Sequence, residues 1–581
     1  MLSRRQFIIA SSGLGVGFAV PTILAKRSSA QFPTYTPSPQ ISKFTESLPI
    51  PSVISPPSTL TIANGSHRFH SSLGPAKTMG YGGASYLGPT IQATRSTPVK
   101  ITAVNNVQSH PLPDSIVKSL HGVDQDDDVN PRMAVHLHGS NTEAKSDGYP
   151  SDTFKRGQTY DYFFNNNQEA ATLWYHDHAL GITGANVMAG LAGLYLLRDV
   201  DDPIGGNGPL GIPAGPPYEI PLVLQDRRFN ADGTLKYFLI PGTWQVEFMG
   251  DVATVNGKAW PNLNVDRTLY RFRIVNGSSA RFYNLKLSSG QPIVVIGSDQ
   301  GMLNAPVSVS SLLISPGERY DVLIDFSQRL PGEKIVLRND AASPFPFGRA
   351  NPILNQPALP EIMQFTVKSG TANPKPVPQK LRVHKPQITR LSPQMAVRQR
   401  YLTLVEIAGP GGPEVVLQNY IFWDEAENNP ALRERPKVDT VEQWNIINLQ
   451  PVAHPMHLHL VPFQILNRQK IDATQYLKAY NAVGSRMAHS HSGDEMVPGY
   501  PPPDPTPYAV GPARPPAPYE AGWKDTVIVN PNEVIRLLVP FGANAAPNLP
   551  FGNSFTGNYV WHCHMLEHED NEMMLPFEVI P

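Results

Sequence analysis

The sequence predicts an all-β protein divided into three domains of similar size. The chain has 581 residues, which is several times the length of an ordinary domain. It contains 60 prolines and 45 glycines, with short runs rich in valine, isoleucine, threonine and tyrosine between them. An all-α chain could hardly carry this much proline, because proline interrupts the interior of a helix. We therefore expect many short strands joined by turns.

Charge and hydropathy narrow the possible partners. The formal net charge is −1 and only 16% of the residues are charged, so nothing indicates a nucleic-acid partner. Beyond the N-terminal segment no stretch is apolar enough to cross a membrane, and we expect no membrane span in the mature chain. We expect a monomer.

Residues 1–30 have the features of an export signal rather than of a folded domain. Arg4 and Arg5 precede a mildly apolar stretch at 7–20, and small residues at 28–30 offer a cleavage site. The apolar stretch is too short to span a bilayer. The paired arginines resemble a twin-arginine signal, which exports folded proteins to the periplasm or the outside. An ordinary secretory signal or a retained anchor is the alternative.

Breaks in composition divide the rest of the chain. The first domain is expected at 31–200, before a stretch rich in glycine and proline, and the second at 216–368. A proline-rich linker follows at 369–395, and the third domain occupies 396–581. Histidine is absent from Asp199 to Lys380, so we expect the chemistry in the outer two domains.

The histidines occur in closely spaced pairs. The 17 histidines form five His-x-His pairs, several times more than random placement would give. Four pairs fall in runs that read as strands: His136/His138, His176/His178, His457/His459 and His562/His564. Residues i and i+2 of a strand face the same side, so each pair directs two imidazoles to one place. Imidazole is a common ligand of copper, zinc and iron, which favours metal sites over hydrogen-bonded core histidines.

The only cysteine, Cys563, lies between the two histidines of the last pair. On a strand its side chain faces away from theirs, so it must serve a second site. The nearest candidate partners are His568 and Met573, and His454 offers another imidazole. Two histidines, a thiolate and a weak thioether form the ligand set of a blue-copper electron-transfer centre. The alternative is a buried cysteine that acts as a small hydrophobic residue.

One peptide unit separates Cys563 from each flanking histidine. This connects a one-electron site to a cluster of eight imidazoles, which is large enough for three coppers. Such a cluster can give dioxygen four electrons without releasing partly reduced products. The combination predicts an oxidase.

The segments around these residues resemble the four copper motifs of the multicopper oxidases. They read VHLHGS followed by SDGYP, LWYHDHALGIT, HPMHLHLVPFQIL, GWKDTV and YVWHCHMLEHEDNEMM. The chain is most similar to bacterial spore-coat laccases and bilirubin oxidases, from about Gln40 to the C-terminus. The resemblance implies three cupredoxin-like Greek-key β-barrel or sandwich domains. It places a type 1 copper in the third domain and a trinuclear cluster between the first and third.

The resemblance also implies a ligand set for four copper ions. The type 1 copper would have four ligands: His454, Cys563, His568 and Met573. Family spacing favours Met573 over its neighbour Met574. The type 2 copper would be bound by two residues: His136 and His457. The type 3 pair would be bound by the other six histidines: His138, His176, His178, His459, His562 and His564.

Four residues are implied to be catalytic. Cys563 and His568 belong to the type 1 site, where the substrate gives up single electrons. Glu569 would lie on the route of protons into the trinuclear site, and Asp147 in SDGYP matches an acidic residue near the dioxygen exit and proton network. A surface charge is the alternative for Glu569, and an ordinary turn is the alternative for Asp147.

Two features depart from the family pattern. Spore-coat laccases can carry a disulfide, which a chain with one cysteine cannot form internally. The segment from Arg486 to Glu520 is longer than the usual connection and contains the fifth pair, His489/His491. We expect a solvated loop there, with a labile copper site or a substrate contact as the alternative.

The function implied is a laccase-like oxidation coupled to the reduction of dioxygen to water, with phenols, aromatic amines or bilirubin-type pigments as small-molecule electron donors. The alternative is a metallo-oxidase of Cu(I), Fe(II) or Mn(II). Such enzymes often carry a methionine-rich insert, whereas the 14 methionines of this chain are dispersed. A copper-free structural relative would require lost ligands, and a two-domain nitrite reductase would not supply a trinuclear cluster.

Overall fold

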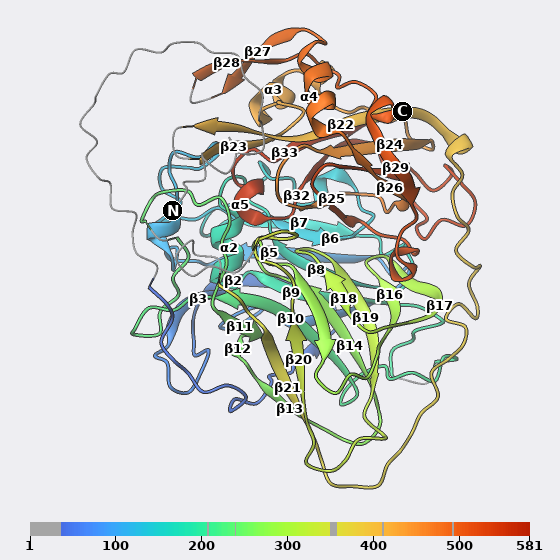
Figure 1. Ribbon diagram of the computed structural model, residues 1–581. Helices are drawn as coiled ribbons and strands as arrows, with labels where there is room; N and C mark the ends of the chain where they lie inside the picture. The colour runs from blue at the N-terminus through green and yellow to red at the C-terminus, as the bar shows by residue number, and fades with distance from the viewer. Residues whose placement is uncertain (1–35, 206–207, 239, 349–356, 410–411, 491–492) are drawn as a thin grey trace. The chain divides into compact units, whose positions relative to one another are not determined.

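The protein is built mostly from β-strands, with only short helices between them (Figure 1). This computed structural model describes residues 36–205, 208–238, 240–348, 357–409, 412–490 and 493–581. The predicted export signal at 1–30 lies outside these residues. Within them, no helix combines the length and the apolar character that a membrane crossing requires. The prediction of an all-β protein is confirmed.

The first third of the chain forms two sheets. One has the order β3 (Ala76–Tyr81), β2 (Thr59–His67), β5 (Val99–Asn105), β7 (Thr159–Phe164). The other has the order β1 (Val53–Ile54), β4 (Thr90–Thr94), β9 (Ala192–Arg198), β8 (Ala171–Asp177), β6 (Val135–His138). Three short helices connect strands here: η1 (Pro113–Ser115), η2 (Ala144–Ser146) and α2 (Thr183–Ala189). In β5 every second residue is buried, so one face of this strand lies on the core.

The middle third also forms two sheets. The larger has the order β12 (Lys258–Ala259), β11 (Val252–Val255), β10 (Glu219–Arg227), β14 (Leu269–Asn276), β19 (Arg319–Asp325), β16 (Ile293–Ser298), β17 (Gly301–Val309). The smaller has the order β13 (Asn262–Val265), β21 (Glu361–Val367), β20 (Lys334–Asn339), β15 (Tyr283–Leu287), β18 (Leu312–Ile314). Every residue of β10 and β14 is buried, so these strands are covered on both faces.

The last third contains the remaining sheets. The largest has the order β23 (Gly412–Gln418), β22 (Ala396–Gly409), β24 (Val441–Asn448), β31 (Glu533–Pro540), β26 (Gln464–Ile471), β29 (Ala509–Arg514). A second has the order β30 (Thr526–Val529), β25 (His454–Leu458), β32 (Gly557–Cys563), β33 (Met574–Val579). The helices of this part are η4 (Pro393–Met395), α3 (Trp423–Asn428), η5 (Pro430–Leu432), α4 (Ala473–Asn481), η6 (Thr506–Tyr508), η7 (Pro518–Glu520) and α5 (Leu566–Glu569).

Among the described strands, no sheet mixes strands from different thirds of the chain. This agrees with three successive units, each built on two main sheets, the last with the β27–β28 hairpin added. The domain boundaries given above stay a prediction. Buried ion pairs connect the first two thirds. Arg198 of β9 binds Glu219 of β10, and Arg273 of β14 binds the same carboxylate. Because breaking such a buried pair leaves an uncompensated charge, these contacts hold the two parts in one arrangement.

The segment from Arg486 to Glu520 differs from the expected solvated loop. It begins in a hairpin formed by β27 (Ser485–Ser490) and β28 (Gly493–Pro498). Ala488 and Val497 are buried, whereas Met487 and Met496 are exposed. This alternation allows one face of the hairpin to pack on the core, which the glycines and prolines of the segment concealed. His491 lies outside the described residues.

Candidate copper sites

Strand pairing brings the four histidine pairs together two by two. In the first third, β6 and β8 are antiparallel neighbours with His136 opposite His176. In the last third, β25 and β32 are antiparallel neighbours with His457 opposite His562. Each pair begins within a strand, as the sequence predicted, and the second member lies within it or directly after it. The two pairs of strands therefore each present four imidazoles.

The two sets of imidazoles form one cluster across the first and last thirds. The rings of His138 and His457 stack with centroids 3.6 Å apart, and those of His136 and His459 stack at 3.8 Å. The eight histidines are at most 1% exposed. All eight are the residues predicted for the trinuclear site: His136, His138, His176, His178, His457, His459, His562 and His564.

In six of these rings one nitrogen is occupied by a hydrogen bond to an oxygen. The Nδ1 atoms of four rings approach main-chain oxygens: His136 with Asp147 (2.6 Å), His176 with Asp177 (2.8 Å), His457 with Asp525 (2.9 Å) and His562 with Cys563 (3.2 Å). His459 Nδ1 lies 2.7 Å from Asp147 Oδ2. His138 uses its other nitrogen for this contact, since its Nε2 lies 3.1 Å from Asp525 Oδ1. These contacts fix which nitrogen of each ring faces the interior of the cluster.

The inward nitrogens are left without protein partners. Seven buried ring nitrogens of the cluster have no hydrogen bond: His136 Nε2, His138 Nδ1, His176 Nε2, His178 Nδ1, His457 Nε2 and both nitrogens of His564. Three more converge, because His562 Nε2 lies 3.3 Å from His178 Nε2 and 3.2 Å from His459 Nε2. Buried polar atoms are rarely left unsatisfied in native proteins. Several triads of donor atoms within 4.8 Å of one another fit metal ions that would satisfy them.

Burial favours the neutral form of seven of these imidazoles: His136, His138, His176, His178, His457, His459 and His564. It lowers the pKa of His176 to about 3 and that of His178 to about 3. It also lowers the pKa of His136 and of His457 well below the usual value, and neighbouring histidines act in the same direction. A histidine must be neutral to donate its lone pair to a metal. These seven rings are therefore in the protonation state that copper requires.

Cys563 forms a second group on the other side of β32. Its Sγ lies 3.4 Å from His454 Nδ1 and 3.7 Å from His568 Nδ1, and the two Nδ1 atoms are 3.3 Å apart. The cysteine is fully buried, and burial raises the pKa of its thiol. A bound metal ion would displace the proton, because a coordinating thiol is deprotonated. One thiolate and two imidazoles at these distances fit a single copper ion.

The two methionines near this group occupy different surroundings. Met573 is fully buried in the same hydrophobic cluster as Cys563, and its main-chain oxygen accepts a hydrogen bond from the Cys563 amide at 3.0 Å. Met574 packs in another cluster with Tyr149 and Trp423. This difference favours Met573 as the residue that adds a thioether to the Cys563 group.

The two carboxylates from the sequence both lie against the eight-imidazole cluster. Glu569 Oε2 is 3.1 Å from His562 Nδ1, and Glu569 Oε1 is 3.6 Å from His178 Nδ1. Burial raises the pKa of Glu569, but the two histidines and hydrogen bonds from His562 and Thr183 together outweigh burial, so the pKa is lowered. Asp147 contacts His136 and His459 directly, and burial raises its pKa well above the usual value. Neither is a surface charge.

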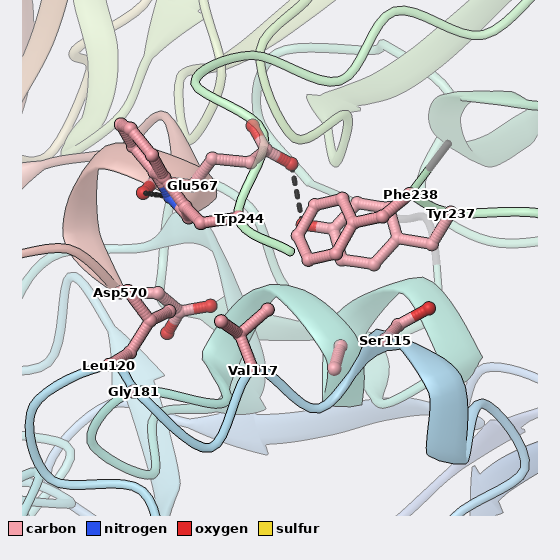
Figure 2. Close-up of a pocket in the computed structure, with 10 residues that line it drawn as sticks. Ser115, Val117, Leu120, Gly181, Tyr237, Phe238, Trp244, Glu567 and Asp570 are labelled. Atoms are coloured by element: carbon pink, nitrogen blue, oxygen red, sulfur yellow. Dashed lines mark hydrogen bonds between the residues drawn. The ribbon is translucent and has the colours of Figure 1, made fainter. Parts of the chain in front are cut away.

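The sequence reasoning missed other carboxylates around the two groups. Asp525 contacts His138 and His457, and the only signal was its place in the GWKDTV motif. Glu567 and Asp570 flank Glu569 and line a small cavity between α2, α5 and the segment around Tyr237 and Trp244 (Figure 2). Tyr237 donates a hydrogen bond to the Glu567 carboxylate, and Trp244 Nε1 donates to its main-chain oxygen at 2.9 Å.

The fold and the two groups define a class of protein. A β-protein that joins one thiolate–imidazole site through adjacent residues to a buried cluster of eight imidazoles has the design of a copper oxidase. Comparison with known proteins then gives the family.

Three domain models described as multicopper oxidase match residues 123–202, 228–340 and 418–581. The laccase of Bacillus subtilis (strain 168) is 35% identical over an alignment covering 93% of this chain and 99% of that laccase. A laccase of Haloferax volcanii is 31% identical, with 99% of this chain and 91% of that protein covered. The crystal structure of the McoA multicopper oxidase of Aquifex aeolicus aligns with a TM-score of 0.68 and 26% identity, covering 93% of this chain and 100% of that one.

The chain belongs to the multicopper oxidase family. It is a copper-dependent oxidoreductase that uses dioxygen, and its domains are cupredoxin-like. Its cofactors are four copper ions, one of type 1, one of type 2 and two of type 3.

Proposed function

We propose that the protein is a laccase-like oxidase that takes one electron at a time from phenols, aromatic amines or bilirubin-type pigments. Four such electrons and four protons reduce one dioxygen molecule to two water molecules. One observation carries the proposal: Cys563 of one group lies in sequence directly between His562 and His564 of the other, so adjacent residues connect the two sites. The similarity to proteins named laccase at more than 30% identity supports the choice of substrates.

The proposed ligand set is the one implied by the sequence. The type 1 site consists of four residues: His454, Cys563, His568 and Met573. The type 2 site consists of His136 and His457. The type 3 pair is bound by His138, His176, His178, His459, His562 and His564. When bound, copper supplies the one-electron redox chemistry and a place for dioxygen to bind. The unsatisfied ring nitrogens and the short Sγ to Nδ1 distances support this set.

The chain's own residues have three tasks in this proposal. The hydrophobic surroundings of Cys563 exclude water from the electron-entry site. Glu569, which contacts His178 and His562, holds and passes on protons for dioxygen reduction. Asp147 orients His459 and takes part in the same proton supply.

We further propose that the mature protein is a monomer that is exported by the twin-arginine route. Arg4 and Arg5 support this route, and so does the cluster, because histidines from both ends of the chain meet only in the folded protein. Replacing both arginines by lysine should leave the protein in the cytoplasm, measured by fractionation. Unchanged export would point to an ordinary secretory signal.

The substrate class is tested with the purified, copper-loaded protein. Oxygen uptake is measured with a phenol, with bilirubin and with Cu(I), and the Cys563→Ser variant serves as the control. We expect uptake with the organic donors, at one dioxygen per four one-electron donors, and none in the variant. Rapid turnover of Cu(I) with little oxidation of the phenol or bilirubin would favour the metallo-oxidase alternative.

A further inference from the structure

The middle third of the chain supplies none of the proposed copper ligands, yet it reaches the eight-imidazole cluster. It contains no histidine between Asp199 and Lys380. Two of its side chains, Gln300 and Arg319, nevertheless bind the carboxylate of a residue that contacts two histidines of the cluster. That carboxylate belongs to Asp525, which lies in the last third directly before β30.

Arg319 and Gln300 hold both oxygens of Asp525. Arg319 Nη1 donates to Oδ1 at 2.6 Å and Arg319 Nη2 donates to Oδ2 at 2.6 Å, which is a bidentate pair. Gln300 Nε2 donates to Oδ2 at 2.6 Å. The Asp525 and Arg319 side chains are at most 1% exposed. The planar fork of the guanidinium therefore sets the plane of the carboxylate.

Asp525 in turn contacts one ring from each side of the cluster. Its Oδ1 lies 3.1 Å from His138 Nε2, and its main-chain oxygen lies 2.9 Å from His457 Nδ1. Because Nε2 of His138 is occupied by this contact, only Nδ1 is left to face a metal ion. The five other rings with such a bond use Nδ1 for it and leave Nε2: His136, His176, His457, His459 and His562. His138 therefore faces the cluster through Nδ1 instead of Nε2, and the Asp525 carboxylate is the group that binds its Nε2.

The packing around Gly139 shows how closely this arrangement fits the ligand strand. Gly139 follows His138 and has a φ of +90°. A Cβ atom there would lie 2.6 Å from Arg319 Nη2, 2.8 Å from Asp525 Oδ2 and 2.8 Å from Gln300 Nε2. Its main-chain oxygen accepts a hydrogen bond from Gln300 Nε2 at 2.8 Å. The three side chains are therefore packed directly against the backbone that carries His138.

We propose that Arg319 and Gln300 are positioning residues of the trinuclear site, which act through Asp525 on the orientation of His138 and His457. This inference rests on the ligand set proposed above. The middle domain then contributes to copper binding without a ligand of its own. Partners that orient metal-bound histidines typically change metal affinity by about 10- to 100-fold when they are removed.

The test compares Arg319→Gln with a matched control, Arg271→Gln. Both arginines are fully buried and bind carboxylates, but Arg271 binds Asp202, Asp321, Glu219 and a main-chain oxygen, none of them in the cluster. Each copper-loaded protein is dialysed against a chelator, and copper per chain, the type 2 electron paramagnetic resonance signal and the blue absorption are measured. We expect Arg319→Gln to lose copper from the trinuclear site at about a tenfold lower chelator concentration, with a changed type 2 signal, and to keep the blue absorption. Arg271→Gln should lower the melting temperature but keep all the copper.

Two milder variants keep the test decisive if Arg319→Gln does not fold. Arg319→Lys keeps the charge without the fork, and Gln300→Leu removes one donor while Gly139 keeps its bond from Gln168. Both should change the type 2 signal, Gln300→Leu by less. The inference is overturned if these variants hold copper and give the same signal as the wild type. A wild-type chain that binds no copper would overturn the proposed function instead, so the two failures can be told apart.

Discussion

The Cys563 group and the eight-imidazole cluster differ in how much of the chain is needed to build them. The Cys563 group takes its residues from β25, β32, α5 and the residues just before β33, all in the last third. The cluster takes four histidines from the first third and four from the last, and its outer contacts also come from the middle third. One site is local and the other is assembled. Substitutions at the local site should therefore change one property at a time, whereas the assembled site should respond to changes in all three parts.

The largest effect is expected at the local site itself. Cys563→Ser should remove the blue colour and abolish oxidation, because the thiolate-to-copper charge transfer and the entry point for electrons are both lost. Optical absorption, copper content and oxygen uptake check this. The imidazole cluster should keep its copper, since its ligands are untouched. A blue, active variant would show that Cys563 does not bind the type 1 copper. The Cys563 group would then not be the electron-entry site.

The next largest effect is expected from Glu569, which connects the two sites because it follows His568 and contacts His562. Glu569→Leu should lower turnover by at least about tenfold, since a positioned proton donor contributes roughly 10² or more. Stopped-flow absorption separates the steps: anaerobic reduction of the blue band should be normal, and reoxidation by dioxygen should be slow. Slow reduction with normal reoxidation would place Glu569 in substrate docking instead.

A smaller effect of the same kind is expected from Asp147→Asn. The amide oxygen can still accept a hydrogen bond from His459 Nδ1, so the ring should keep its orientation. The group can no longer exchange a proton, and turnover should fall by less than about tenfold with a shifted pH profile. Steady-state rates across a pH series check this. If Asp147→Asn is more damaging than Glu569→Leu and also loses copper, its role is to hold the cluster together rather than to supply protons.

The smallest effect on activity is expected at Met573. Met573→Leu should keep the blue centre and raise its potential, because the axial thioether is a weak ligand that lowers the potential. Redox titration of the blue band measures the shift, and Met574→Leu is the matched control, since Met574 packs in a different hydrophobic cluster. A shift in Met574→Leu instead would reassign the axial ligand.

The local patterns of the sequence were sufficient to predict which residues would gather at the two proposed copper sites. Two-residue periodicity and a single cysteine predicted strands that present His562 and His564 to one side and Cys563 to the other. The structure has this arrangement in β32 and brings the predicted residues together. These signals work because a strand converts sequence spacing directly into side-chain direction.

The outer contacts could not be predicted in the same way. Asp525 meets Arg319 across 206 positions and His138 across 387, and no local pattern encodes such distances. The cavity lined by Glu567 and Asp570 likewise needs segments from all three thirds. The hairpin from Ser485 was missed because glycine and proline drew attention to turns, while its apolar alternation was short.

The position of β32 and α5 near the C-terminus has a consequence for timing. Both proposed copper sites include residues between His562 and Met573, within the last twenty positions of the chain. A ribosome must therefore synthesise the chain through Met573 before both sites can be complete. A chain truncated before His562 would carry scattered histidines but neither complete set of ligands. Acquisition of the metal is thereby postponed until this segment has been made, and a product that lacks it remains colourless.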